Sequence, residues 1–138
     1  MLAPTSSLIE SAVKAARNEF GDKADLFKAI VLRMNDLNGS DYEDCKFPGV
    51  YVLVHEDKGY IKVGKSQSNA SKRALEHFSK SITVKEYVEL GMSGLRQSER
   101  MYMLIFALQN QEKMHWVLAL EHYLERELKP SLQSKRNG

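Results

Sequence analysis

Apolar and polar residues alternate in two short stretches near the middle of the chain. Residues 50–55 (VYVLVH) place a valine at every second position, and residues 60–64 (YIKVG) alternate in the same way. Because successive side chains of a β-strand point to opposite faces, this alternation predicts two strands. The polar segment 56–59 ends in glycine and predicts a tight antiparallel turn between them. In such a hairpin Tyr51 and Lys62 share one face.

Apolar residues recur at three- and four-residue steps toward the N-terminus, which is typical of helices. The stretch from Ser7 to Glu10 has the form of a capping box, and Gly21 is a suitable end for this first helix. A second helix is expected over residues 22–37. The whole helical segment, residues 1–45, is expected to pack on the rest of the chain. It could equally mediate dimerisation or widen the contact with a ligand, and these interpretations stay open.

The apolar run 101–108 (MYMLIFAL) is compatible with a buried helix or with a central strand. Its length and its polar boundaries favour a strand that is covered on both faces. A helical stripe follows, made of Met114, Val117, Leu118, Leu124 and Leu128. Glu121 falls inside this stripe. Because a lone buried carboxylate is costly, Glu121 is expected either to form a salt bridge or to bind a metal.

Positive charge is concentrated just after the hairpin. The chain carries a net charge of +2, but residues 58–80 contain six basic residues and one acidic residue, which gives +5. A helix is expected after the polar loop 65–69, and Arg73 and His77, four residues apart, lie on the same side of it. A basic segment on an otherwise acidic chain suits a polyanionic ligand. A solvated lysine-rich helix is the plainer alternative.

These elements together resemble the GIY-YIG nuclease family. Gly49-Val50-Tyr51 stands where the family has its first motif, and Lys62-Val63-Gly64 stands where it has its second. Arg73 and His77 match the family's arginine and histidine on the following helix, and Glu121 matches its metal-binding glutamate on a late helix. Five elements in the right order are considerably more specific than either short motif alone.

The resemblance covers residues 47–133. It implies an α/β (α+β) fold, in which a small three-stranded antiparallel sheet flanked by helices forms a nuclease-like domain over residues 46–138. Residues 1–45 would then be an N-terminal helical extension. In the segment 130–133 the chain has Gln133 where the family has an asparagine.

The resemblance also implies a DNA endonuclease that uses Mg²⁺ or Mn²⁺. Tyr51 would be the general base, and a tyrosine serves this purpose only when nearby positive charge, here Lys62, lowers its pKa from about 10. Arg73 would contact the phosphate, His77 would orient the nucleophile or the phosphate, and Glu121 would hold the ion. Substrate contacts are assigned to Gly64, Lys65, Ser66, Lys72 and Gln133.

Two departures from the family pattern leave a second interpretation open. Lys62 replaces the second tyrosine of the family's name, and Gln133 replaces the asparagine that braces the site. Both substitutions would suit a module that keeps the fold and binds nucleic acid without cleaving it. A third interpretation is a small interaction protein with an accidental motif match, whose N-terminal helices form the functional surface.

Length and composition limit the classes of protein to which the chain could belong. With 138 residues and 43% hydrophobic content, the chain is expected to form one globular domain. No apolar run approaches the length of a membrane span, and the N-terminus lacks the layout of a signal peptide, so a cytoplasmic protein is expected. The single cysteine, Cys45, excludes an internal disulfide and offers no zinc-ligand spacing.

Overall fold

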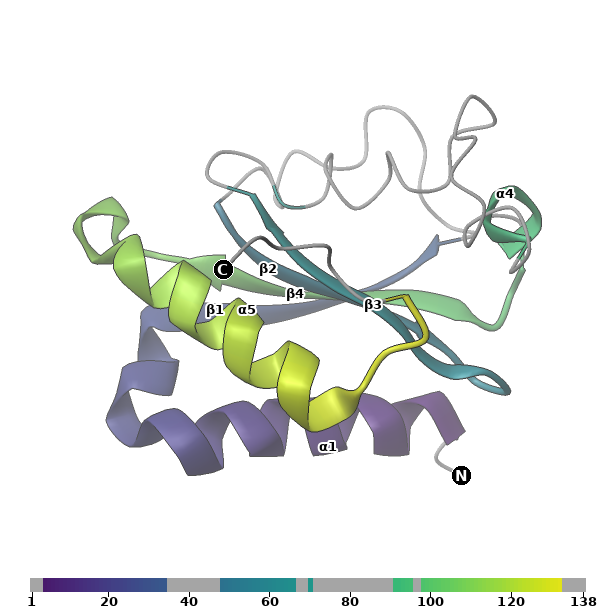
Figure 1. Ribbon diagram of the computed structural model, residues 1–138, viewed down its shortest axis with the longest axis horizontal. Helices are drawn as coiled ribbons and strands as arrows, with labels where there is room; N and C mark the ends of the chain where they lie inside the picture. The colour runs from purple at the N-terminus through teal and green to yellow at the C-terminus, as the bar shows by residue number, and fades with distance from the viewer. Residues whose placement is uncertain (1–3, 35–47, 67–69, 71–90, 96–97, 133–138) are drawn as a thin grey trace.

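The computed structural model describes residues 4–34, 48–66, 70, 91–95 and 98–132. Within these residues a sheet is combined with helices in an α+β arrangement (Figure 1). The elements are α1 (Pro4–Phe20), η1 (Gly21–Leu26), β1 (Phe27–Arg33), β2 (Gly49–His55), β3 (Gly59–Ser66), α4 (Met92–Leu95), β4 (Met101–Leu108), η4 (Gln111–Lys113) and α5 (His115–Leu128).

The sheet is antiparallel and has the strand order β1-β4-β2-β3. The α+β class is confirmed, with four strands where the sequence led us to expect three. The predicted central strand is confirmed as well, because β4 lies between β1 and β2 and seven of its eight residues are buried. The hairpin of β2 and β3 also forms, with Gly59 in its turn at a φ of +79°.

The prediction of a second N-terminal helix over residues 22–37 is wrong. The structure has the short 3₁₀-helix η1 followed by β1, which pairs with β4 along its whole length. The apolar residues of this stretch fit both a helical and an alternating pattern, and β4 decides between them. As an apolar strand it requires hydrogen-bonding neighbours on both edges, and β1 supplies the second one. The boundary proposed at residue 45 lies outside the described residues.

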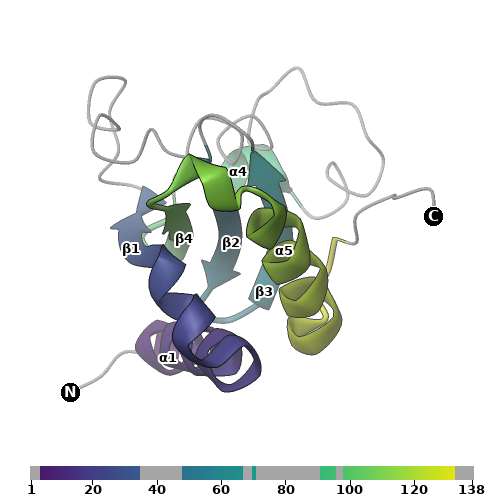
Figure 2. The ribbon, with the colours of Figure 1, turned by 90° about the vertical axis from the view of Figure 1, so that its left-hand side faces the viewer.

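Each side of the sheet carries its own hydrophobic cluster. Figures 1 and 2 show α1 and α5 on one side of the sheet and α4 on the other. We call the side that α1 and α5 cover the helix face, and its buried strand residues are Val50, Val52, Val54, Val63, Leu104, Phe106 and Leu108. We call the opposite side the site face, and its buried strand residues are Tyr51, Leu53, Ile61, Met101, Met103, Ile105 and Ala107.

Helix α1 is held against the sheet by packing and by one strong hydrogen bond. Ala12 and Ala16 are buried in the helix-face cluster, and the Tyr60 hydroxyl donates to the Leu8 carbonyl oxygen at 2.6 Å. The helix begins at Pro4, earlier than the capping box predicted, and ends before Gly21, whose φ is +56°. No helix among the described residues combines the length and the apolar character that crossing a membrane requires.

Candidate functional site

The hairpin of β2 and β3 brings Tyr51 and Lys62 to the same face of the sheet. In its register Tyr51 lies opposite Gly64, and Leu53 lies opposite Lys62. Residues directly opposite each other in an antiparallel pair project to the same side, so Tyr51 and Lys62 are diagonal neighbours on the site face. The alternation in the sequence predicted this shared face, and the register confirms it.

Gly64 makes room for the Tyr51 side chain. A Cβ atom at position 64 would overlap the Tyr51 hydroxyl and Cζ, and it would lie 2.9 Å from Cε1. The hydroxyl end of the phenol therefore lies over the backbone of its cross-strand partner. A side chain at position 64 would have to displace the end of Tyr51 that carries the hydroxyl. Gly64 thus has a structural reason to be glycine, which sets the position of the tyrosine.

Gly49, in the first motif, is required for a different reason. A Cβ atom at this position would overlap the carbonyl oxygen of Phe106 and would lie 3.2 Å from Cα of Ala107. Both contacts are to the backbone of β4, which cannot move aside as a side chain can. A glycine inside a strand indicates such a close backbone approach, and this signal was available in the sequence.

Tyr51 and Lys62 are enclosed. Tyr51 is 1% exposed and Lys62 is 7% exposed. On the outer side of β3, the chain that follows α5 runs beside Lys62 and pairs with it through Leu132. The backbone N–H of Leu132 donates to Ile61 at 2.8 Å, and that of Ser131 donates to Tyr60 at 3.0 Å. The outer edge of β3 is therefore covered here.

Glu121 is also enclosed, as its place in the apolar stripe predicted. It is 5% exposed and is buried on α5 together with Val117, Leu120 and Leu124. Leu118, assigned to the same stripe, is instead 52% exposed. Helix α5 packs along β3 and β2 on the helix face, whereas Tyr51 and Lys62 project from the site face. Glu121 and the hairpin residues thus lie on opposite sides of the sheet. A site that contains both would have to extend around the outer edge of β3.

The remaining predicted site residues divide into two groups. Lys65 and Ser66 are half-buried at the end of β3, where they pair with Val50 and Gly49. The other four lie outside the described residues, so the structure does not place them relative to Tyr51. These are Lys72, Arg73, His77 and Gln133.

The turn of the hairpin holds a polar network that sequence patterns did not indicate. The His55 Nδ1 atom accepts a hydrogen bond from the Asp57 backbone N–H at 3.1 Å, and its Nε2 lies 3.3 Å from the Ser98 hydroxyl. Arg100 forms ion pairs with Glu56 at 2.9 Å and with Asp57 at 3.0 Å. Burial lowers the pKa of His55 below its ordinary value of 6.5, and Arg100 acts in the same direction.

Within the part of the chain that the structure describes, no three His, Cys, Asp or Glu side chains cluster closely enough to hold a metal ion. Any ion at Glu121 would thus have at most two such side chains from these residues as ligands, with other oxygens completing its shell. Comparison with known proteins gives no match to a family model, a curated protein or a solved structure.

Proposed function

We propose that this protein is a DNA endonuclease that cleaves phosphodiester bonds with the help of Mg²⁺ or Mn²⁺. The observation that carries the proposal is the β2–β3 hairpin, where Tyr51 lies over Gly64 and shares a face with Lys62. A tyrosine in contact with its partner's backbone has few rotamers open to it. Preorganisation of this kind is what a catalytic group requires.

In this proposal Tyr51 accepts the proton of the attacking water, directly or through one hydrogen-bonded relay. A phenol is a weak base at neutral pH, so it needs positive charge nearby to favour its ionised form. Lys62, one diagonal position away on the same face, is the candidate for that charge. The enclosure of both residues supports the pairing, because charges interact more strongly where water is excluded.

Glu121 is the residue that would hold the ion. It is a carboxylate placed among apolar helix residues that pack along β3, and hard cations such as Mg²⁺ prefer oxygen ligands. With Glu121 as a ligand, phosphate oxygens and water would supply most of the rest of an octahedral shell. The ion would neutralise charge that builds on the phosphate during cleavage.

Arg73 and His77 enter the proposal from the sequence alone. Their four-residue spacing puts both on one side of the expected helix, in the segment 58–80 that carries a charge of +5. Arginine presents a planar pair of N–H donors that matches two phosphate oxygens. The basic segment would attract a polyanionic strand toward this part of the chain.

The burial of Tyr51 and Lys62 also favours a second candidate function. At 1% and 7% exposure, these residues offer little surface to an attacking water. A module that binds nucleic acid through its basic segment, while Tyr51 and Lys62 only support the fold, would show the same burial. The two candidates differ in whether DNA is cut, since both predict that DNA is bound.

The decisive experiment measures nicking of supercoiled plasmid and cleavage of single-stranded DNA with Mg²⁺, with Mn²⁺ and with EDTA. Wild-type protein is expected to cut at least one substrate, and only with a divalent ion. Glu121→Gln is expected to abolish cutting, while Glu127→Gln, an exposed carboxylate on the same helix, is expected to cut at the wild-type rate. DNA binding without cutting by the wild type would establish the second candidate instead.

A control on folding accompanies the comparison, because Glu121 is buried. Circular dichroism and the thermal unfolding midpoint of Glu121→Gln should match those of the wild type within a few degrees. If a folded Glu121→Gln variant cuts DNA at the wild-type rate, the assignment of the ion to this carboxylate is wrong.

A further inference from the structure

Strand β1 forms one edge of the sheet that the described residues build. Within the described residues, β1 pairs with β4 on one side and has no strand on the other (Figure 2). Leu26 and Gln109 lie opposite each other, one position beyond the Phe27–Leu108 pair of β1 and β4. The Gln109 backbone N–H donates to the Leu26 carbonyl oxygen at 2.9 Å. Because backbone groups alternate in direction along a strand, the even-numbered residues of β1 face β4. The N–H and C=O groups of Ala29 and Val31 therefore face away from it.

This edge exposes apolar side chains as well as backbone. Val31 is 48% exposed, and Ala29 is also exposed on the same face. The seven residues of β1 contain no proline, and their pairing with β4 shows no bulge. Proline and bulges are devices by which natural sheets block unwanted pairing at their edges. The only protection visible on β1 is charge near its two ends, from Lys28 and Arg33.

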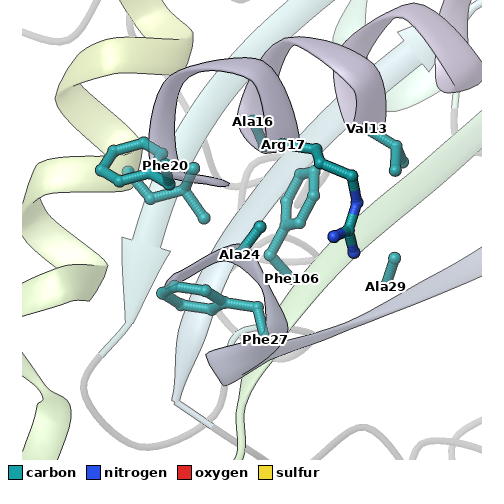
Figure 3. Close-up of a pocket in the computed structure, with 9 residues that line it drawn as sticks. Val13, Ala16, Arg17, Phe20, Ala24, Phe27, Ala29 and Phe106 are labelled. Carbon is teal, nitrogen blue, oxygen red and sulfur yellow. The ribbon is translucent and has the colours of Figure 1, made fainter. Parts of the chain in front are cut away.

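An apolar cavity of about 110 Å³ opens beside this edge (Figure 3). It lies between α1 and the sheet, with Phe27 and Ala29 of β1 on its strand side and Phe20 on its helix side. Arg17 borders it, and its guanidinium forms an ion pair with Asp25 at 2.9 Å. Ala29 lines the cavity, and Val31 projects from the same face of β1 two residues farther along the strand.

We propose that β1 pairs in antiparallel fashion with β1 of a second copy of this chain, which joins two sheets into one. A two-fold axis at Ile30 aligns all seven residues and places Ala29 opposite the partner's Val31. In this register the outward-facing residues meet each other as hydrogen-bonded pairs, as an antiparallel ladder requires. A shift by one residue would pair outward-facing groups with groups that face β4.

Side-chain chemistry supports the same register. Val31 of each copy would cover the exposed Ala29 of the other copy, at the border of that copy's cavity. The two-fold axis makes this contact twice. Lys28 would lie opposite the partner's Leu32, and Arg33 opposite the partner's Phe27. Like charges directly opposite each other destabilise a strand pair, and this register opposes none.

The alternative dimer, through the N-terminal helices, would have to use an apolar stripe that already packs within the chain. The apolar stripe of α1 is turned toward the sheet and α5, where Ala12 and Ala16 are 0% and 3% exposed. Phe20 packs edge-on against Trp116 and Tyr123 of α5. These contacts are made within one chain, whereas Val31 remains exposed.

Sedimentation equilibrium over a range of protein concentrations tests the proposal. Wild-type protein is expected to show a concentration-dependent monomer–dimer equilibrium. Val31→Pro removes an outward N–H without removing a bond to β4, and it is expected to raise the dissociation constant about tenfold or more, since two symmetric hydrogen bonds are lost. Val31→Thr keeps the N–H and serves as the matched control, with a dissociation constant close to that of the wild type.

A cross-linking experiment tests the register without relying on dissociation. In a Cys45→Ser background, Ile30→Cys places two thiols opposite each other at the axis, at a Cα separation of about 4.5 Å that suits a disulfide. Leu32→Cys is the matched control, because it would face the partner's Lys28. Mild oxidation is expected to give a covalent dimer for Ile30→Cys and very little for Leu32→Cys.

A monomer at all concentrations would overturn the proposal, as would a dimer that Val31→Pro leaves unchanged. Equal cross-linking of the two cysteine variants would overturn the register. Each variant is first checked by circular dichroism, and the cysteine variants, which keep every backbone N–H, give a result even if Val31→Pro fails to fold. None of these outcomes depends on whether the protein cleaves DNA.

Discussion

The two faces of the sheet are built from different kinds of residue. The helix face presents valines, leucines and one phenylalanine to α1 and α5, and its strand residues include no polar group that is buried. The site face mixes methionines and aliphatic residues with a buried tyrosine and a buried lysine. Burying a polar group costs free energy that an apolar residue would not cost. The strands of the helix face thus contribute apolar packing alone, whereas those of the site face also bury polar side chains.

The sharpest test of this contrast compares one tyrosine from each side of the hairpin. Tyr51→Phe removes a hydroxyl from the site face and is expected to lower the cleavage rate by about 10² to 10⁴, the range for loss of a general base. Tyr60→Phe removes the hydroxyl that bonds to Leu8 and is expected to cost about 1 kcal/mol of stability with no change in cleavage rate. Single-turnover cleavage and urea unfolding measure the two quantities. Equal cleavage rates for both variants would remove the catalytic role from Tyr51.

A large-to-small change on the helix face should have the opposite signature. Leu104 is fully buried on β4, and Leu104→Ala is expected to lower the free energy of unfolding by about 3 kcal/mol through lost contacts and a cavity. The cleavage rate per folded molecule should stay at the wild-type value at a temperature where the variant is folded. A loss of cleavage that exceeds the unfolded fraction would show that the two faces are not independent.

A smaller effect is expected where the two strands of the hairpin touch. Gly64→Ala would overlap the Tyr51 ring and is expected to destabilise the protein by about 2 kcal/mol, a typical cost of overpacking. The same change in a Tyr51→Ala background should cost less, because the ring that it meets is gone. Unfolding of the four proteins of this double-mutant cycle gives the coupling energy directly. Additive costs would mean that Gly64 is not needed to seat the tyrosine.

The smallest expected effect comes from His55 in the turn. Because burial lowers its pKa below 6.5, the unfolded chain binds more protons than the folded chain between the two pKa values. The contribution of this group to stability is therefore complete above about pH 6.5, and it falls as the pH drops toward the folded pKa. Urea unfolding from pH 7.5 to 5 should show this loss in the wild type. A His55→Gln variant with the same slope would assign the pH dependence to other groups.

Part of this architecture could be predicted from the sequence because it depends on local patterns. The hairpin and the central strand followed from a period of two and from an eight-residue apolar run with polar ends. The burial of Glu121 followed from its position in a helical stripe. In each case the residues that decide the structure are adjacent or a few positions apart.

The failures have a common physical cause, which is dependence on distant partners. Residues 27–33 form a strand because β4 needs a neighbour, and nothing within those seven residues excludes a helix. Gly49 signals a close backbone approach, but the residues around it do not identify the partner, which is the backbone of β4 more than fifty residues later. The His55 network likewise joins the hairpin turn to Ser98 and Arg100, which no periodic pattern relates to it.

The strand order also has a consequence for how the chain reaches its native state. The hairpin pairs residues that are close in sequence, but β1 and β4 pair across separations of roughly 70 to 80 residues. Closing such a long loop costs entropy before any contact compensates for it, so folding is expected to be slow for a domain of this size. During synthesis β1 leaves the ribosome early and cannot pair until residue 108 has followed it. The strand that is made first therefore waits longest for its partner.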